Sequence, residues 1–232
     1  MREAGAHVAP LRWGLPDVLI AWIVGVVAGV IVTTPFVDVD TNTVSPGGIA
    51  AAIYAQNIGT IVALALIARW KGLGSLAADF GLSASLREIW WVAVGTGLAL
   101  LTNLLVLPLT ELAGLEESAQ EIVNQFEDAS PLVKGLLFPG VVVLAPLAEE
   151  LLFRGILLRA MLRRWSPAVA VFGSAFIFAV IHLVDPDTIY YLPAFLLLGL
   201  VSAWRALVTG RLSQSIYLHA GFNLLASLLI VT

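Results

Sequence analysis

The chain of 232 residues contains no cysteine and few charged residues. The absence of cysteine excludes disulfide bonds, thiol nucleophiles and cysteine-ligated metal sites. Charged residues make up only 12% of the chain and hydrophobic residues 59%, whereas soluble domains have roughly 25% charged residues. No basic cluster lies beside an aromatic surface, so nucleic acid is not an expected partner. The composition predicts an integral membrane protein, with membrane lipid as a partner.

Long apolar runs, bounded by proline, glycine and charged residues, recur along the whole chain. A membrane-spanning helix needs about 20 apolar residues, and several runs reach that length. We therefore predict an all-α fold, a polytopic transmembrane helical bundle of about seven spans. The predicted spans lie near residues 17–36, 48–68, 89–110, 132–160, 168–184, 189–208 and 213–231.

The basic residues between these runs predict the orientation of the chain in the membrane. Lysine and arginine in short loops stay preferentially on the cytoplasmic side. The opposite loops are acidic, with Lys134 as their only base. We therefore predict a cytoplasmic N-terminus and an external C-terminus in the cell membrane. The bases that fall on the predicted cytoplasmic side are Arg2, Arg12, Arg69, Lys71, Arg87, Arg159, Arg163, Arg164, Arg205 and Arg211.

Two adjacent acids, Glu149 and Glu150, lie well inside the fourth predicted span. A charged group at membrane depth costs about 2.5–3.5 kcal/mol, so such residues usually face the bundle interior and serve a function. Glu150 and Arg154 are one helical turn apart and can form an ion pair, whereas Glu149 points to a neighbouring face. We therefore expect Glu150 to hold Arg154, and Glu149 to be free for proton transfer.

Two of the three histidines also fall within predicted spans. His182 ends the run Phe178-Ala-Val-Ile-His182, and His219 lies one helical turn before Asn223, on the same face. One histidine within a membrane helix is more often a packing residue. Two histidines, an asparagine and a glutamate pair on three helices instead predict one shared polar site.

This group of residues has the chemistry needed for amide hydrolysis. Glu149 and His182 can bind and deprotonate a water molecule, while His219 and Asn223 can donate hydrogen bonds to an oxyanion. Alternatively, Glu149, His182 and His219 can hold a Zn²⁺ ion with one position left for water. The sequence leaves both schemes open.

The fourth predicted span is longer than a membrane requires. Residues 132–165 would extend about 51 Å as a straight α-helix, against a hydrocarbon core of about 30 Å. Pro139 and Pro146 are the expected kink positions. If the basic end of this segment projects into the cytoplasm, the site opens towards the cytoplasm.

Three motifs on separate predicted helices resemble those of the CPBP family, which comprises CAAX proteases, bacteriocin-processing enzymes and proteins like lysostaphin resistance protein A. Glu-Glu-x-x-x-Arg occurs at 149–154, Phe-x-x-x-His at 178–182 and His-x-x-x-Asn at 219–223. They follow the family's order. The resemblance divides the chain into N-terminal helices without a motif, residues 1–131, and a CPBP-like catalytic region of four helices, residues 132–232.

The resemblance implies an intramembrane endopeptidase, of glutamate type or metallo type. Glu149 would activate water with the help of His182, His219 and Asn223 would stabilise the oxyanion, and Glu150 with Arg154 would hold the site together. The substrate would be a membrane-associated protein or peptide, prenylated or unmodified. Two other functions stay open: a non-catalytic protein for bacteriocin self-immunity or scaffolding with the same fold, and a small proton-coupled transporter.

Overall fold

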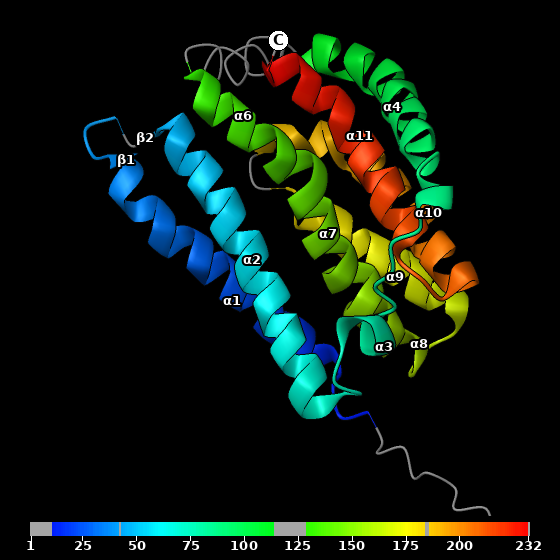
Figure 1. Ribbon diagram of the computed structural model, residues 1–232. Coiled ribbons are helices and arrows are strands. Elements are labelled where there is room, and N and C mark those ends of the chain that lie inside the picture. The colour runs from blue at the N-terminus through cyan, green and yellow to red at the C-terminus, as the bar shows by residue number, and fades with distance from the viewer. Residues whose placement is uncertain (1–10, 42, 114–128, 184–185, 232) are drawn as a thin grey trace, which may run out of the picture.

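The computed structural model describes residues 11–41, 43–113, 129–183 and 186–231, and within them the fold is a helical bundle (Figure 1). Five helical segments of this part are long and apolar enough to cross a membrane. The all-α, polytopic fold class predicted from the sequence is confirmed. The five segments are Leu15–Phe36, Pro46–Lys71, Leu86–Pro108, Pro131–Leu162 and Ile189–Thr209.

The first two long helices form a closely packed pair along one side of the bundle (Figure 1). Helix α1 (Leu15–Thr33) continues into the 3₁₀ helix η1 (Thr34–Phe36), and α2 (Pro46–Lys71) returns beside it. A short antiparallel hairpin, β1 (Val37–Asp38) with β2 (Thr43–Val44), connects them. A side chain at Gly25 would collide with Thr60 of α2, so the glycine permits the close approach.

The next segment leads from the α1–α2 pair to the opposite side of the bundle. It contains α3 (Leu76–Phe80), η2 (Leu86–Glu88) and α4 (Trp91–Ala113). Phe80, at the end of α3, is fully buried, and its side chain lies against Gly155. This contact fixes the short connecting helix to the centre of the bundle.

The segment that carries the two glutamates is one long helical column with two changes of hydrogen-bond register. It comprises α6 (Pro131–Pro139), the π-helical η3 (Gly140–Leu144), α7 (Ala145–Glu150), the π-helical η4 (Leu151–Leu157) and α8 (Leu158–Leu162). All seven residues of η4 are buried. The prolines predicted as kink positions, Pro139 and Pro146, lie on either side of η3. Because proline has no backbone N–H to donate, the hydrogen-bond pattern departs from that of an α-helix here.

Three helices complete the bundle around this column. They are α9 (Pro167–Val180), α10 (Leu192–Thr209), preceded by η5 (Pro186–Tyr191), and α11 (Ser213–Val231). Helix α11 packs along α4, and Thr96 donates a hydrogen bond to the carbonyl of Gly221 at 2.9 Å. A Cβ atom at either Gly95 or Gly221 would collide with the backbone of the other helix. These two glycines therefore set how closely α4 approaches α11.

Each of the seven predicted spans coincides with a helix of the described part, although α9 has only 14 residues. The predicted fifth span, 168–184, was too long. Helix α9 ends at Val180, and His182 lies in the turn that follows. The side chain of His182 contacts the carbonyl of Phe178, one of the groups that a helix end leaves unpaired. Residues 114–128, which make up most of the acidic segment between the third and fourth predicted spans, lie outside the described residues.

Candidate active site

Glu150 and Arg154 form a fully buried ion pair within the central column. The Glu150 Oε1 to Arg154 Nη1 distance is 3.1 Å, and both side chains have no exposed surface. Arg154 Nη2 also donates a hydrogen bond to the carbonyl of Gly199 on α10, and its guanidinium lies 4.3 Å from the centre of the Phe178 ring. The predicted pairing of these two residues is thus present, and it joins three helices at the level of the site.

His219 of α11 joins this pair to the second glutamate. Its Nδ1 lies 3.0 Å from Glu150 Oε1, and its Nε2 lies 3.6 Å from Glu149 Oε2. Because an ionised carboxylate only accepts hydrogen bonds, Nδ1 carries a proton. In the neutral ring, the Nε2 lone pair then faces Glu149.

His182 approaches Glu149 from the end of α9 with a similar arrangement. Its Nδ1 lies 2.7 Å from the Phe178 carbonyl, and its Nε2 lies 3.7 Å from Glu149 Oε2. A carbonyl oxygen also only accepts, so Nδ1 is again the protonated nitrogen. Phe195 stacks on the ring at 4.6 Å between centres and fixes its plane.

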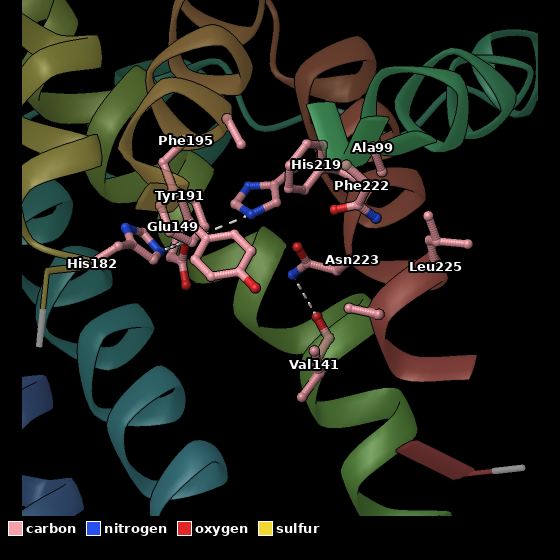
Figure 2. Close-up of a pocket in the computed structure, with 13 residues that line it drawn as sticks. Ala99, Val141, Glu149, His182, Tyr191, Phe195, His219, Phe222, Asn223 and Leu225 are labelled. Atoms are coloured by element: carbon pink, nitrogen blue, oxygen red, sulfur yellow. Dashed lines mark hydrogen bonds and ion pairs between the residues drawn. The ribbon is translucent and has the colours of Figure 1, made fainter. Parts of the chain in front are cut away.

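Glu149 is therefore the residue on which the two histidines converge (Figure 2). Its Oε2 atom is buried and has no hydrogen-bond partner within the described part of the chain. Both Nε2 atoms lie beyond hydrogen-bond distance from it. A buried carboxylate oxygen without a hydrogen bond is costly, which is acceptable where the atom has a function. Glu150, the adjacent residue, binds both Arg154 and His219 through Oε1, and its Oε2 is likewise buried without a hydrogen-bond partner in the described part of the chain.

Asn223 lines the same cavity as Glu149 and His219 but makes a different contact (Figure 2). Its Nδ2 donates a hydrogen bond to the backbone carbonyl of Val141 in η3, at 3.0 Å. The sequence placed Asn223 on the face of His219, and the structure agrees. The contact with Val141 was not predicted, because it depends on the π-helical register of η3.

Two cavities meet at Glu149 and His182. The first, of about 270 Å³, lies between α4, α10 and α11, and the second, of about 480 Å³, lies towards α1 and α2. Both are lined by Glu149 and His182, so this pair is accessible from two sides. The polar lining of the second cavity, which the sequence did not reveal, comes from Gln56, Asn57 and Thr60 of α2.

The predicted zinc ligands, Glu149, His182 and His219, share one feature with a metal site but lack its arrangement. Both histidines hold Nδ1 against an oxygen and leave Nε2 towards Glu149, an orientation that metal-bound histidines also use. The described residues nevertheless contain no group of three or more histidine or acidic side chains spaced to hold a metal ion. As arranged, these side chains do not fit a zinc site.

The fold and this cluster define an integral membrane protein of the polytopic helical class, with a site of glutamates and histidines in its interior. Residues 131–225 match the family described as type II CAAX prenyl endopeptidase Rce1-like. The match confirms the resemblance to the CPBP proteases over the region that carries the three motifs. No curated protein and no solved structure matched the chain.

Proposed function

We propose that the protein is an intramembrane endopeptidase in which Glu149 activates the water that attacks the peptide bond. The observation that carries this proposal is the position of Glu149 Oε2, which is buried, lacks a hydrogen-bond partner among the described residues and lies 3.6–3.7 Å from two imidazole Nε2 atoms. A general base needs a lone pair that is free to accept a proton and a position close to the water that it activates. The family match of residues 131–225 supports the same reaction class.

In the proposed reaction, a water molecule binds between Glu149 and His182. Glu149 takes one proton from the water as its oxygen forms a bond to the carbonyl carbon of the peptide. The carbonyl electron pair moves onto the oxygen and gives a tetrahedral oxyanion. When the C–N bond breaks, the proton held by Glu149 passes to the leaving nitrogen. Water is thus divided between the two products, and Glu149 returns to its ionised form.

The oxyanion needs hydrogen-bond donors in a site that excludes bulk water. His219 can donate from Nε2 when both ring nitrogens carry a proton, and Glu150 holds its Nδ1 at 3.0 Å. Asn223 holds Val141 with one amide N–H, which leaves the second N–H for the oxyanion. Glu150 holds His219, and Arg154 in turn holds Glu150, while neither residue lines the cavities, so both are assigned a positioning role.

The two cavities support a substrate that extends to both sides of Glu149. An extended peptide cleaved in its interior has chain on each side of the scissile bond, and each cavity can accept one side. Gln56 and Asn57 of α2 offer hydrogen-bonding groups to the peptide backbone in the larger cavity. We propose a membrane-associated substrate, of the prenylated CAAX type that the family name describes.

The proposed location is the cell membrane, with the N-terminus in the cytoplasm. Helix α1 begins and α11 ends at opposite ends of the bundle (Figure 1), which supports termini on opposite sides of the membrane. The arginine and lysine residues near the start of α1 and the end of α2 support a cytoplasmic position for that end.

The test is cleavage of membrane-associated peptides by the purified protein in liposomes. Glu149→Gln keeps the size of the side chain and removes the base, so we expect the rate to fall at least about 100-fold. Lys134→Gln is the matched control, because it neutralises one charge on the same helical column outside both cavities. Wild-type activity in Glu149→Gln would refute the proposal. Loss of activity after metal removal, restored by Zn²⁺, would favour the metallo type.

A further inference from the structure

A basic pocket lies where α1 begins and α2 and α8 end. Figure 1 shows these helix ends at the same end of the bundle. Its volume is about 540 Å³, and none of its lining residues is among those assigned to the active site. We call it the basic pocket and define it by its charged and aromatic lining. These residues are Arg12, Trp13, Asp17, Lys71, Arg163 and Arg164.

One of the four bases in the basic pocket is neutralised within the protein. Lys71 Nζ lies 2.6 Å from Asp17 Oδ1. The other oxygen of Asp17 accepts the backbone N–H of Gly14 at 2.9 Å and occupies the N-terminus of α1. Asp17 is the only acid among the lining residues that the structure describes. Among the lining residues that the structure describes, the three arginines therefore have no carboxylate partner.

Two of the three arginines, Arg12 and Arg163, are oriented by contacts that leave donors free. Arg12 Nη2 donates to the carbonyl of Trp70 at 2.7 Å, and Arg163 Nη2 donates to the carbonyl of Trp13 at 2.5 Å. The Arg163 guanidinium also lies 4.0 Å from the centre of the Trp13 ring. Each guanidinium has five N–H donors, so both retain several for a ligand.

Arg164 stands at the wall of the pocket beside Gly14, where a Cβ atom would lie 3.8 Å from its Nη1. Partial burial, and secondarily the positive charge of Arg164, lower the pKa of Arg163 below its usual value. Two adjacent arginines thus repel each other, and the acid described in the pocket, Asp17, is paired with Lys71. An anion between them would remove that repulsion, and a phosphate group matches the fork of a guanidinium.

The basic pocket lies at the depth of lipid headgroups. It is located where three apolar helices end, at Leu15, Lys71 and Leu162. Trp70 and Trp165, at the same end, are 64% and 45% exposed, and tryptophan side chains concentrate at the membrane–water interface. The outer surface of α1 beside the pocket is apolar, with Leu19 and Ile20 about half exposed. A phosphate bound here can therefore belong to a lipid whose chains lie along α1.

We propose that the basic pocket binds the phosphate of an anionic membrane lipid. Arg12, Arg163 and Arg164 donate hydrogen bonds to the phosphate oxygens, and the Trp13 ring holds the Arg163 side chain in position. The negative surface of the cytoplasmic leaflet supplies such lipids at the end of the bundle where bases collect. This site is separate from the proposed peptidase site, and its occupancy does not depend on that activity.

Lipid retention by the full-length, delipidated protein tests the proposal. We expect native mass spectrometry to detect phosphatidylglycerol adducts about tenfold more readily than phosphatidylcholine adducts. Arg164→Gln should weaken phosphatidylglycerol binding about fivefold, the effect of one basic residue near a membrane surface. Arg69→Gln is the matched control, because it removes one exposed positive charge from the same end of α2 outside the pocket. We expect it to stay within about twofold of wild type, since it does not contact the phosphate.

Three results would overturn the proposal. Equal retention of the two lipids would show that the pocket does not select an anion. Equal losses in Arg164→Gln and Arg69→Gln would show that only the general surface charge matters. A rise in Tm with inorganic phosphate, without preference for phosphatidylglycerol, would identify free phosphate rather than lipid as the ligand. If Arg164→Gln still cleaves peptides, its change in lipid binding is independent of the proposed peptidase function.

Discussion

Asn223 Nδ2 donates a hydrogen bond to the backbone carbonyl of Val141 at 3.0 Å. The reason for this contact lies in the backbone of η3. The N–H of Ala145 bonds to the carbonyl of Gly140, five residues earlier, so the Val141 carbonyl loses its α-helical donor. The donor that a π-helix would supply is residue 146, which is proline and has no N–H. The Asn223 amide replaces the missing donor.

The first prediction tests this relationship by a double-mutant cycle. Asn223→Ala should lower the free energy of unfolding by about 1–2 kcal/mol, because it leaves a partly buried carbonyl without a partner. In a Pro146→Ala background the same change should cost clearly less, because residue 146 then has an N–H for Val141. Unfolding in mixed detergent micelles gives all four free energies. An equal cost of Asn223→Ala in both backgrounds would contradict the explanation.

The second prediction concerns the different environments of the two adjacent glutamates. Glu150→Gln should lower the free energy of unfolding by about 3–5 kcal/mol, because it leaves Arg154 charged and fully buried without its partner. Glu149→Gln should change it by less than about 1 kcal/mol, because Glu149 Oε2 makes no hydrogen bond within the described residues. The same micelle unfolding measurement compares them. Equal losses would show that both glutamates have a structural role.

The third prediction concerns the contact between α4 and α11. Gly95→Ala places a Cβ atom against the Leu218 carbonyl, so α11 must move away from α4. We expect a loss of about 1–3 kcal/mol in stability and slower peptide cleavage, because His219 follows Leu218 directly. Gly97→Ala is the control on the same helix, since no other atom lies within 4 Å of its Cβ position.

For Gly97→Ala, we expect unchanged cleavage and a stability equal to or up to about 1 kcal/mol above that of wild type, because alanine has the higher helix propensity. Cleavage assays in liposomes and unfolding in micelles measure the two effects separately. Normal cleavage by a correctly folded Gly95→Ala protein would show that the position of α11 does not control the site.

The long helices were predictable because a helix that crosses the apolar interior of the membrane needs a long run of apolar residues. The runs at 17–36 and 48–68 correspond to α1 and α2 within a few residues. The pairing of Glu150 with Arg154 also followed from sequence, since helical periodicity alone puts both on one face. In contrast, α3 and the hairpin at Val37–Val44 are too short to leave a hydropathy signal.

The finer geometry of the site depends on distances between helices, which periodicity does not contain. The hydrogen bond from His219 to Glu150 and the contact from Asn223 to Val141 each join residues more than 60 positions apart. Pro146 was no signal for Val141, because in an α-helix the missing proline N–H leaves the carbonyl of Val142 without its donor, and Val141 follows only from the π-helical register. The second cavity left no signal, since Gln56, Asn57 and Thr60 are ordinary polar residues within an apolar run.

The two π-helical segments also have a consequence for how this protein tolerates changes in length. Each π turn contains one residue more than an α turn, and η3 and η4 flank the pair Glu149 and Glu150 on either side. One residue removed from η3 would restore α-helical phase and rotate the glutamates by about 100° relative to α6. A single-codon deletion there would therefore turn the proposed base away from its histidines while leaving hydrophobicity and helix content almost unchanged.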